Sequence, residues 1–300
     1  MTFYELFNGY TFQVVTTGCI LLGIISGIVG SFAVCKKQGL IGDGISHSTL
    51  PGVVLAFLII GVKDTEFMLF GALVFGLLSA YLVQFIVDNS RVKFDSSLAT
   101  VLSVMFGLGT LLLSYSQKLP NANQAGLKNY IYGQAANMLF SDLIIMMVVG
   151  VIVITLVVLF WKQLKLTTFD PEYAMTIGYN VEKINYLMIF LLVLAIVIGL
   201  QTVGVILMSA MLIAPAVSAR QWTNKFSVMV ILSAFFGALS GGIGSLISIM
   251  DSKLATGPIV VVVATIIALL SILISPKRGS IYRLYQRNKT RKKQMNMEVK

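Results

Sequence analysis

Long apolar runs, each about the length that crosses a lipid bilayer, constrain this 300-residue chain more than any other feature. Hydrophobic residues make up 57% of the chain and charged residues only 11%, with a mean hydropathy of +0.90. Soluble domains carry about 25% charged residues, so this chain has too few to cover a surface that faces water. Spans of about 20 apolar residues instead suit a bilayer. We therefore predict an all-α, polytopic transmembrane helical bundle.

The pattern allows eight to ten spans, and nine is the preferred number. Two of them, residues 187–200 and 203–217, are short and are separated only by Gln201 and Thr202. Gly204 and Pro215 flank the second of these, so we expect a discontinuous or re-entrant helix there, of the kind that lines a translocation route. The nine expected spans are residues 13–35, 40–61, 67–87, 97–115, 143–160, 187–200, 203–217, 226–250 and 258–275.

The formal net charge of +10 is concentrated at one end of the chain. Residues 276–300 hold nine basic side chains and one acid, which accounts for +8 of that charge. A basic extension beside a hydrophobic span is typical of a cytoplasmic anchor, so we expect no nucleic-acid partner. The predicted organisation is a transmembrane domain over residues 1–275 and a basic cytoplasmic tail over residues 276–300.

Basic residues in the short loops predict the orientation in the membrane. Placing them on one side of nine alternating spans makes that side cytoplasmic, with the N-terminus outside and the C-terminus inside a multi-pass cell-membrane protein. These residues are Lys36, Lys37, Arg91, Lys93, Lys162, Lys165, Lys183, Arg220 and Lys225.

The segment with the most chemistry holds Asp43 and His47, and His47 is the only histidine in the chain. The two residues are four apart, so on a helix they project from one face, one turn from each other. Ionisable side chains at membrane depth are costly and indicate function. One carboxylate and one imidazole suit Mn²⁺, Fe²⁺ or Zn²⁺. We predict that Asp43 and His47 bind a metal ion and that a neighbouring span or a second copy of the chain completes the site.

Other interpretations of Asp43 and His47 remain open at this stage. The two side chains could merely pair with each other, or His47 could relay protons, because it titrates near neutral pH. A catalytic role in an intramembrane enzyme is disfavoured, since the pair lacks a third partner or a nucleophile.

Residues 168–180 predict a short helix between two spans. Asp170 can cap it, Pro171 suits its first position and Gly178 can end it. Its acidic and aromatic face is suited to docking into a groove on a partner protein.

Three further residues are weaker candidates for lining the pathway. Ser46 lies beside the Asp43–His47 pair, while Met208 and Ser209 lie in the predicted discontinuous helix. Methionine sulfur can bind metal ions, although methionine in a core usually serves packing.

The chain carries no phosphate-binding loop of the pattern G-x-x-x-x-G-K-[ST]. Outside the Asp43–His47 region no span holds a clear series of buried acids for proton coupling. We therefore expect that this chain is not an enzyme and that any ATP hydrolysis occurs on a separate subunit.

Four stretches together resemble the permease subunit of the manganese, zinc and iron ATP-binding-cassette importers, the ABC-3 family. They are LIGDGISH at residues 40–47, YGQA at 132–135, FDPEYA at 169–174 with Gly178, and VGVIL at 203–207 running on to Pro215. Their order and spacing are specific, and the resemblance covers about residues 10–275. The family pattern usually has alanine in place of Gly44, a difference expected to be mild, and the basic tail is not part of it.

The resemblance implies an assembly of two permease copies, two cytoplasmic ATPase subunits and an extracytoplasmic metal-binding protein. Asp43 and His47 match the family's expected membrane metal site, and residues 121–137 lie where the binding protein would land. The helix at about residues 168–180 would be the coupling helix that docks on the ATPase. Its candidate contact residues are Phe169, Asp170, Glu172, Ala174 and Gly178.

The function that we expect is therefore ATP-driven import of a divalent metal ion. No permanently bound cofactor is expected, and the transported ion would be Mn²⁺, with Zn²⁺ or Fe²⁺ as alternatives. A proton-coupled secondary metal transporter is the alternative function, and an intramembrane enzyme is a more distant one. The sequence does not decide between a homodimer and a heterodimer of permeases.

Overall fold

The computed structural model describes residues 9–62, 64–118, 138–250, 255–276 and 279 of the chain. Within these residues every regular element is a helix, which confirms the predicted all-α fold. The helices are α2 (Tyr10–Cys35), α3 (Ile41–Ser48), α4 (Leu50–Ile60), α5 (Thr65–Asn89), α6 (Phe94–Ser116), α8 (Phe140–Leu159), α9 (Trp161–Phe169), α10 (Pro171–Thr176), α11 (Val181–Thr202), α12 (Val205–Trp222), α13 (Phe226–Met250) and α14 (Thr256–Ile274).

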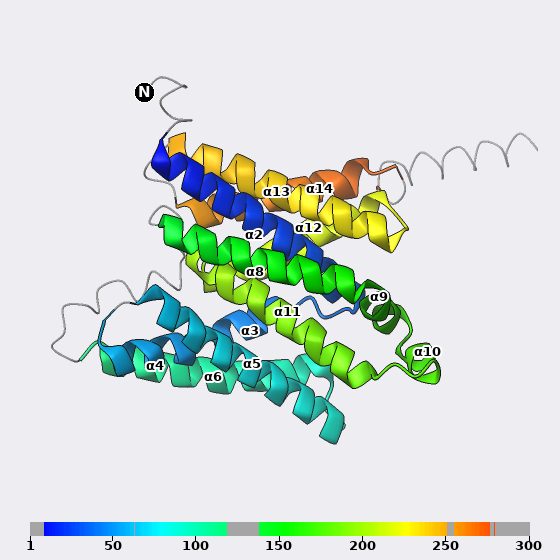
Figure 1. The fold of residues 1–300 in the computed structure, drawn as a ribbon, viewed down its shortest axis with the longest axis horizontal. Coiled ribbons are helices and arrows are strands. Elements are labelled where there is room, and N and C mark those ends of the chain that lie inside the picture. The colour runs from blue at the N-terminus through cyan, green and yellow to red at the C-terminus, as the bar shows by residue number, and fades with distance from the viewer. Residues whose placement is uncertain (1–8, 63, 119–137, 251–254, 277–278, 280–300) are drawn as a thin grey trace, which may run out of the picture.

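Eight stretches among the described residues are long and apolar enough to cross a membrane: α2, α3 together with α4, α5, α6, α8, α11, α13 and α14. Helix α12, which is 18 residues long, is not among these eight stretches, so the preferred count of nine depends on α12 as a further span. Figure 1 shows these helices side by side, with the start of α2 at one end of the bundle and the end of α14 at the other. This arrangement is that of a multi-pass membrane protein.

The sixth and seventh spans are full-length helices, so the prediction of two short spans is wrong. Helix α11 already begins at Val181, so its first turn includes the charged residues Glu182 and Lys183. Helix α12 contains Pro215 without ending there. Gly204 has a φ of 86°, which glycine adopts readily, and lies in the tight connection between the two helices.

The broken helix lies instead in the second span. Helix α3 ends at Ser48 and α4 begins at Leu50, with Thr49 between them. Pro51 has no backbone N–H, so it cannot donate a hydrogen bond to the carbonyl of His47. Figure 1 shows α3 near the middle of the bundle, between α11 and the group formed by α4, α5 and α6.

The backbones of α2 and α13 are in close contact. A Cβ atom at Gly23 would collide with the backbone carbonyl of Gly237, and one at Gly241 would collide with the carbonyl of Cys19. Ser233 lies in the same interface and donates a hydrogen bond of 2.7 Å from its Oγ to the carbonyl oxygen of Gly27. Small residues at these positions allow the two helix backbones to approach each other closely.

One end of the bundle gathers several of the basic residues that were expected on a common side. Lys36 directly follows α2, and its Nζ donates a hydrogen bond of 2.7 Å to Oδ1 of Asn185 near the start of α11. Burial lowers the pKa of Lys36 to about 8. Arg220 and Lys225 share a small cavity with Phe169, the last residue of α9. Figure 1 shows α9 and α10 at this end, opposite the start of α2.

Candidate metal-ion site

Helix α3 is held in the bundle by two glycines on opposite sides of it. A Cβ atom at Gly42 would lie 2.8 Å from Cδ1 of Leu212 and 3.2 Å from Cα of Ser209, both in α12. A Cβ atom at Gly44 would collide with the side chain of Leu98 in α6. Helices α12 and α6 therefore clamp α3 closely.

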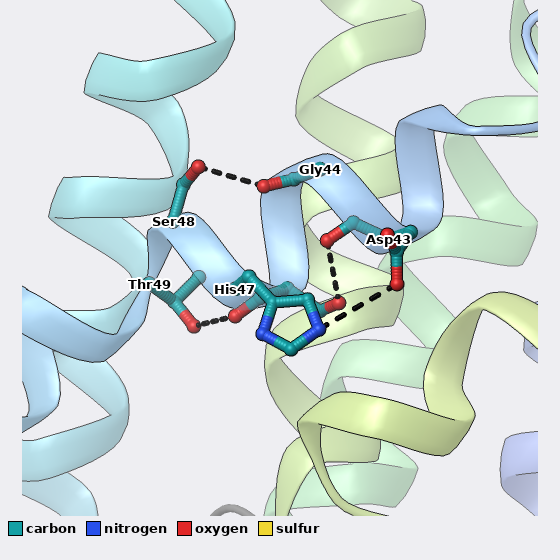
Figure 2. A network of polar contacts seen from close by, with 6 residues as sticks. Asp43, Gly44, His47, Ser48 and Thr49 are labelled. Carbon is teal, nitrogen blue, oxygen red and sulfur yellow. Dashed lines mark hydrogen bonds and ion pairs between the residues drawn. The ribbon is translucent and has the colours of Figure 1, made fainter. Parts of the chain in front are cut away.

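The clamp leaves one face of α3 open. Ile45, Ser46 and Ser48 are buried, whereas the side chains of His47 and Asp43 retain 20% and 43% of their accessible surface. Figure 2 shows these two side chains leaving the same side of α3, with the carboxylate one turn from the imidazole. The predicted juxtaposition is thus present, on a helix that lies near the middle of the bundle (Figure 1).

Asp43 and His47 are near neighbours but are too far apart for a hydrogen bond between their side chains. Nε2 of His47 lies 3.6 Å from Oδ1 of Asp43, beyond the usual range of an N–H···O hydrogen bond. A shared ligand about 2 Å from each atom is compatible with this spacing, because Zn²⁺ and Mn²⁺ bind nitrogen and oxygen ligands at about that distance.

Phe106 of α6 contacts the imidazole ring of His47. The rings of His47 and Phe106 make an edge contact with centroids 5.1 Å apart and an interplanar angle of 86°. Such a contact limits rotation of the imidazole and shields one edge of it from water. No sequence pattern links Phe106 to His47, since the two residues lie on separate spans.

The described residues supply only two metal ligands at this site. Nowhere in the described ranges do three or more His, Cys, Asp or Glu residues lie close enough together to hold a metal ion. The ion must therefore take further ligands from water, from the backbone or from another chain.

The three weaker pathway candidates are placed differently from one another. Ser46 is fully buried and donates a hydrogen bond of 3.1 Å from its Oγ to the backbone oxygen of Asp43, so it supports the turn that carries the carboxylate. Ser209 of α12 lies against Gly42 of α3 and is partly exposed. Met208 is fully buried, and its sulfur packs against Gly199 of α11 rather than toward α3.

The predicted short helix between two spans is α10, at the end of the bundle away from the start of α2 (Figure 1). Oδ1 of Asp170 accepts a hydrogen bond of 2.9 Å from the backbone N–H of Tyr173, which is the predicted cap. Gly178 ends the turn with a φ of 91°. Ala174 is fully buried and anchors the helix.

The other side chains of α10, and those of Phe169 before it and Ile177 after it, are exposed. Glu172 is exposed, and Phe169, Tyr173, Met175 and Ile177 each expose more than half of their surface. Exposed apolar and acidic side chains on a short, capped helix form a surface suited to docking on another protein. Residues 121–137 and most of residues 276–300 lie outside the described residues.

The contact between Gly44 and Leu98 makes a testable prediction about α3. We expect Gly44→Ala to lower the free energy of unfolding by about 1 kcal/mol, because the added methyl group overpacks the α3–α6 contact. Leu98→Val should restore most of the loss when combined with it. Thermal unfolding of the purified variants measures both effects. An unchanged midpoint for Gly44→Ala alone would show that Leu98 of α6 moves aside at no cost in stability.

Comparison with known proteins places the chain in a family. The ABC 3 transport family matches residues 9–275, and the chain belongs to that family. It is 46% identical over 285 residues to the zinc transport system membrane protein TroC of Treponema pallidum, which covers 95% of this chain and 96% of that protein. It is 45% identical to the manganese transport system membrane protein MntC of Bacillus subtilis, with 89% of this chain and 61% of that protein covered.

The fold also matches a solved structure. The structure of PsaBC from Streptococcus pneumoniae in complex with Fab aligns with a TM-score of 0.80 and 34% sequence identity, covering 92% of this chain and 95% of that one. The resemblance inferred from four short motifs is thus confirmed across nearly the whole chain.

Proposed function

We propose that this chain is the membrane-spanning permease subunit of an ATP-binding-cassette importer for divalent metal ions, and that Asp43 and His47 bind the ion in transit. The observation that carries the proposal is the open, adjacent pair on α3, deep in a bundle whose other helices are largely apolar. Relatives named as zinc and manganese transport proteins support the same substrate class.

A second permease copy is the simplest way to complete the metal site. The Asp43 side chain is 43% exposed in the single chain, so it is free to face another protomer. Two copies related by a twofold axis would bring two carboxylates and two imidazoles around one ion, since symmetric dimers present the same surface twice. Four ligands of this kind suit Mn²⁺, Zn²⁺ and Fe²⁺.

Manganese is the substrate that we favour, with zinc or iron as alternatives. One hard oxygen ligand and one borderline nitrogen ligand per chain accept each of these ions, and intrinsic affinity favours Zn²⁺ over Mn²⁺. The site has few ligands and lies on an open face, so it suits an ion that must bind and then leave.

The energy for import would come from two ATPase subunits that dock on α10. The exposed side chains of Glu172 and Tyr173, with Phe169 beside them, offer the docking surface, while Asp170, Ala174 and Gly178 hold the helix in shape. In this arrangement the end of the bundle with α10 is cytoplasmic, and the N-terminus is outside. An extracytoplasmic binding protein would deliver the ion at the opposite end.

Purification of the full chain in mild detergent tests the proposal as a whole. We expect an ATP-hydrolysing subunit with a phosphate-binding loop to co-purify with the permease and to respond to added metal ion. Metal uptake by membranes that lack any such subunit would instead support the proton-coupled carrier.

The cap of α10 gives a sharper prediction about coupling. We expect Asp170→Ala to reduce metal uptake several-fold, because loss of the cap costs about 1 kcal/mol in a six-residue helix. Asp170→Asn is the matched control, since asparagine also accepts the hydrogen bond from the N–H of Tyr173. Equal uptake by the two variants, at equal amounts of protein in the membrane, would contradict a coupling role for α10.

A further inference from the structure

A small cavity at the α10 end of the bundle has no place in the metal pathway described above. Its volume is about 110 Å³. The walls come from the end of α2, the end of α9 and the turn between α12 and α13. The lining residues are Cys35, Phe169, Arg220, Thr223, Asn224, Lys225, Phe226 and Met229.

The charged side chains that line this cavity are all positive. Arg220 and Lys225 line it and no carboxylate does. Across the described ranges neither Arg220 nor Lys225 forms an ion pair with a carboxylate, so the positive charge of both side chains is not neutralised there. A cavity with two cations, a threonine and an asparagine favours an anion with several oxygen atoms.

The backbone adds to the positive potential at the same place. The backbone N–H of Met229 donates to the carbonyl of Lys225, so α13 begins immediately after Lys225. The N–H of Lys225 itself donates to Oγ1 of Thr223 over 3.1 Å, which holds the turn. Lys225 and Phe226, at the start of this 25-residue helix, line the cavity, so the positive end of the helix dipole lies beside it.

The position of the cavity points to the level of the lipid headgroups. The chain has two tryptophans, and both lie beside the cavity. The ring of Trp161 stacks on Phe226 with centroids 5.6 Å apart, and Trp222 comes directly before Thr223. Tryptophan concentrates at the boundary between hydrocarbon and water. The other half of the lining is apolar, so the cavity suits a ligand with a charged head and an apolar body.

We propose that this cavity binds the phosphate group of an anionic phospholipid from the leaflet at the α10 end of the bundle. Its volume accommodates a phosphate group. A bound headgroup would link the ends of α2 and α9 to the α12–α13 turn. Because Phe169 lies in the lining and precedes Asp170, the cap of α10, the lipid would stabilise the base on which α10 stands.

Fluorescence quenching in bilayers tests the proposal with the full chain. The protein is reconstituted into phosphatidylcholine bilayers that contain a small fraction of either brominated phosphatidylglycerol or brominated phosphatidylcholine. Bromine quenches tryptophan only at short range, so Trp161 and Trp222 report the lipid next to the cavity. We expect stronger quenching by the anionic lipid. Combining Arg220→Gln with Lys225→Gln should reduce the apparent preference by about fivefold for each cation removed.

A matched control removes the same charge elsewhere. Lys162→Gln with Lys165→Gln alters two exposed lysines of α9 that do not line the cavity, and the preference should remain. An unchanged thermal midpoint shows that each variant is folded. Equal preference in all three proteins would overturn the proposal.

Two other results would also overturn it. Loss of the preference in millimolar inorganic phosphate would assign the cavity to a free anion. If the Arg220/Lys225 variant kept its lipid preference but no longer co-purified with an ATPase subunit, the two cations would serve an acidic group of that partner.

Discussion

Replacing Asp43 or His47 by alanine is expected to reduce metal-ion uptake by roughly two orders of magnitude. Loss even of an outer-shell partner of a metal ligand typically costs about 10–100-fold, and these two residues would contact the ion directly. Each side chain is the only ligand of its type on the open face of α3. Accumulation of Mn²⁺, Zn²⁺ and Fe²⁺ in cells that carry each variant measures the effect.

The double variant makes this prediction sharper. If Asp43 and His47 hold one ion together, removing both should be little worse than removing either, since groups that act as a unit are not additive. Glu66→Ala is the control, because Glu66 is an exposed acid near the start of α5, away from α3. Normal uptake of all three metals in both single variants would end the assignment of this site.

The largest effect on stability is expected from Gly237→Ala in the α2–α13 interface. The added Cβ would meet the carbonyl group of Gly23, which is backbone and cannot rotate away. The two helices would have to separate, which would weaken the hydrogen bond from Ser233 to Gly27 as well. We expect a loss of about 3 kcal/mol or more, at the upper end of overpacking effects. Thermal unfolding and the yield of monodisperse protein measure it.

Gly107→Ala provides the matched control for that variant. Gly107 also lies within a helix, α6, but a Cβ atom there would have no neighbour within 4 Å. Alanine favours a helix over glycine, so this change should be neutral or slightly stabilising. If Gly237→Ala proved as stable as Gly107→Ala, α2 and α13 would not be in backbone contact in the membrane.

The sequence predicted the helical membrane fold because length and apolar composition alone determine a span. Local hydrogen bonding likewise made α10 predictable, since its cap at Asp170 and its end at Gly178 depend only on neighbouring residues. The lengths of α11 and α12 were underestimated because helices continue beyond the apolar core into residues such as Glu182 and Arg220. Hydropathy detects the apolar core of a span and not its ends.

Only part of the candidate site could be predicted from the sequence. Spacing alone placed Asp43 and His47 on one face of a helix, as observed. The edge contact with Phe106 and the clamp by Leu98 and Leu212 could not be predicted, because they join spans far apart in the chain. The break at Thr49 has a local cause, since Pro51 lacks the backbone N–H that would continue the helix.

Direct binding of Mn²⁺ to the purified full-length protein tests the central claim most simply. Electron paramagnetic resonance measures free Mn²⁺ in solution, and its signal falls when the ion binds. We predict saturable binding that approaches one ion for every two chains, that Zn²⁺ displaces, and that is absent when Asp43→Ala and His47→Ala are combined. Equal Mn²⁺ binding by the unaltered protein and by that double variant would contradict the claim.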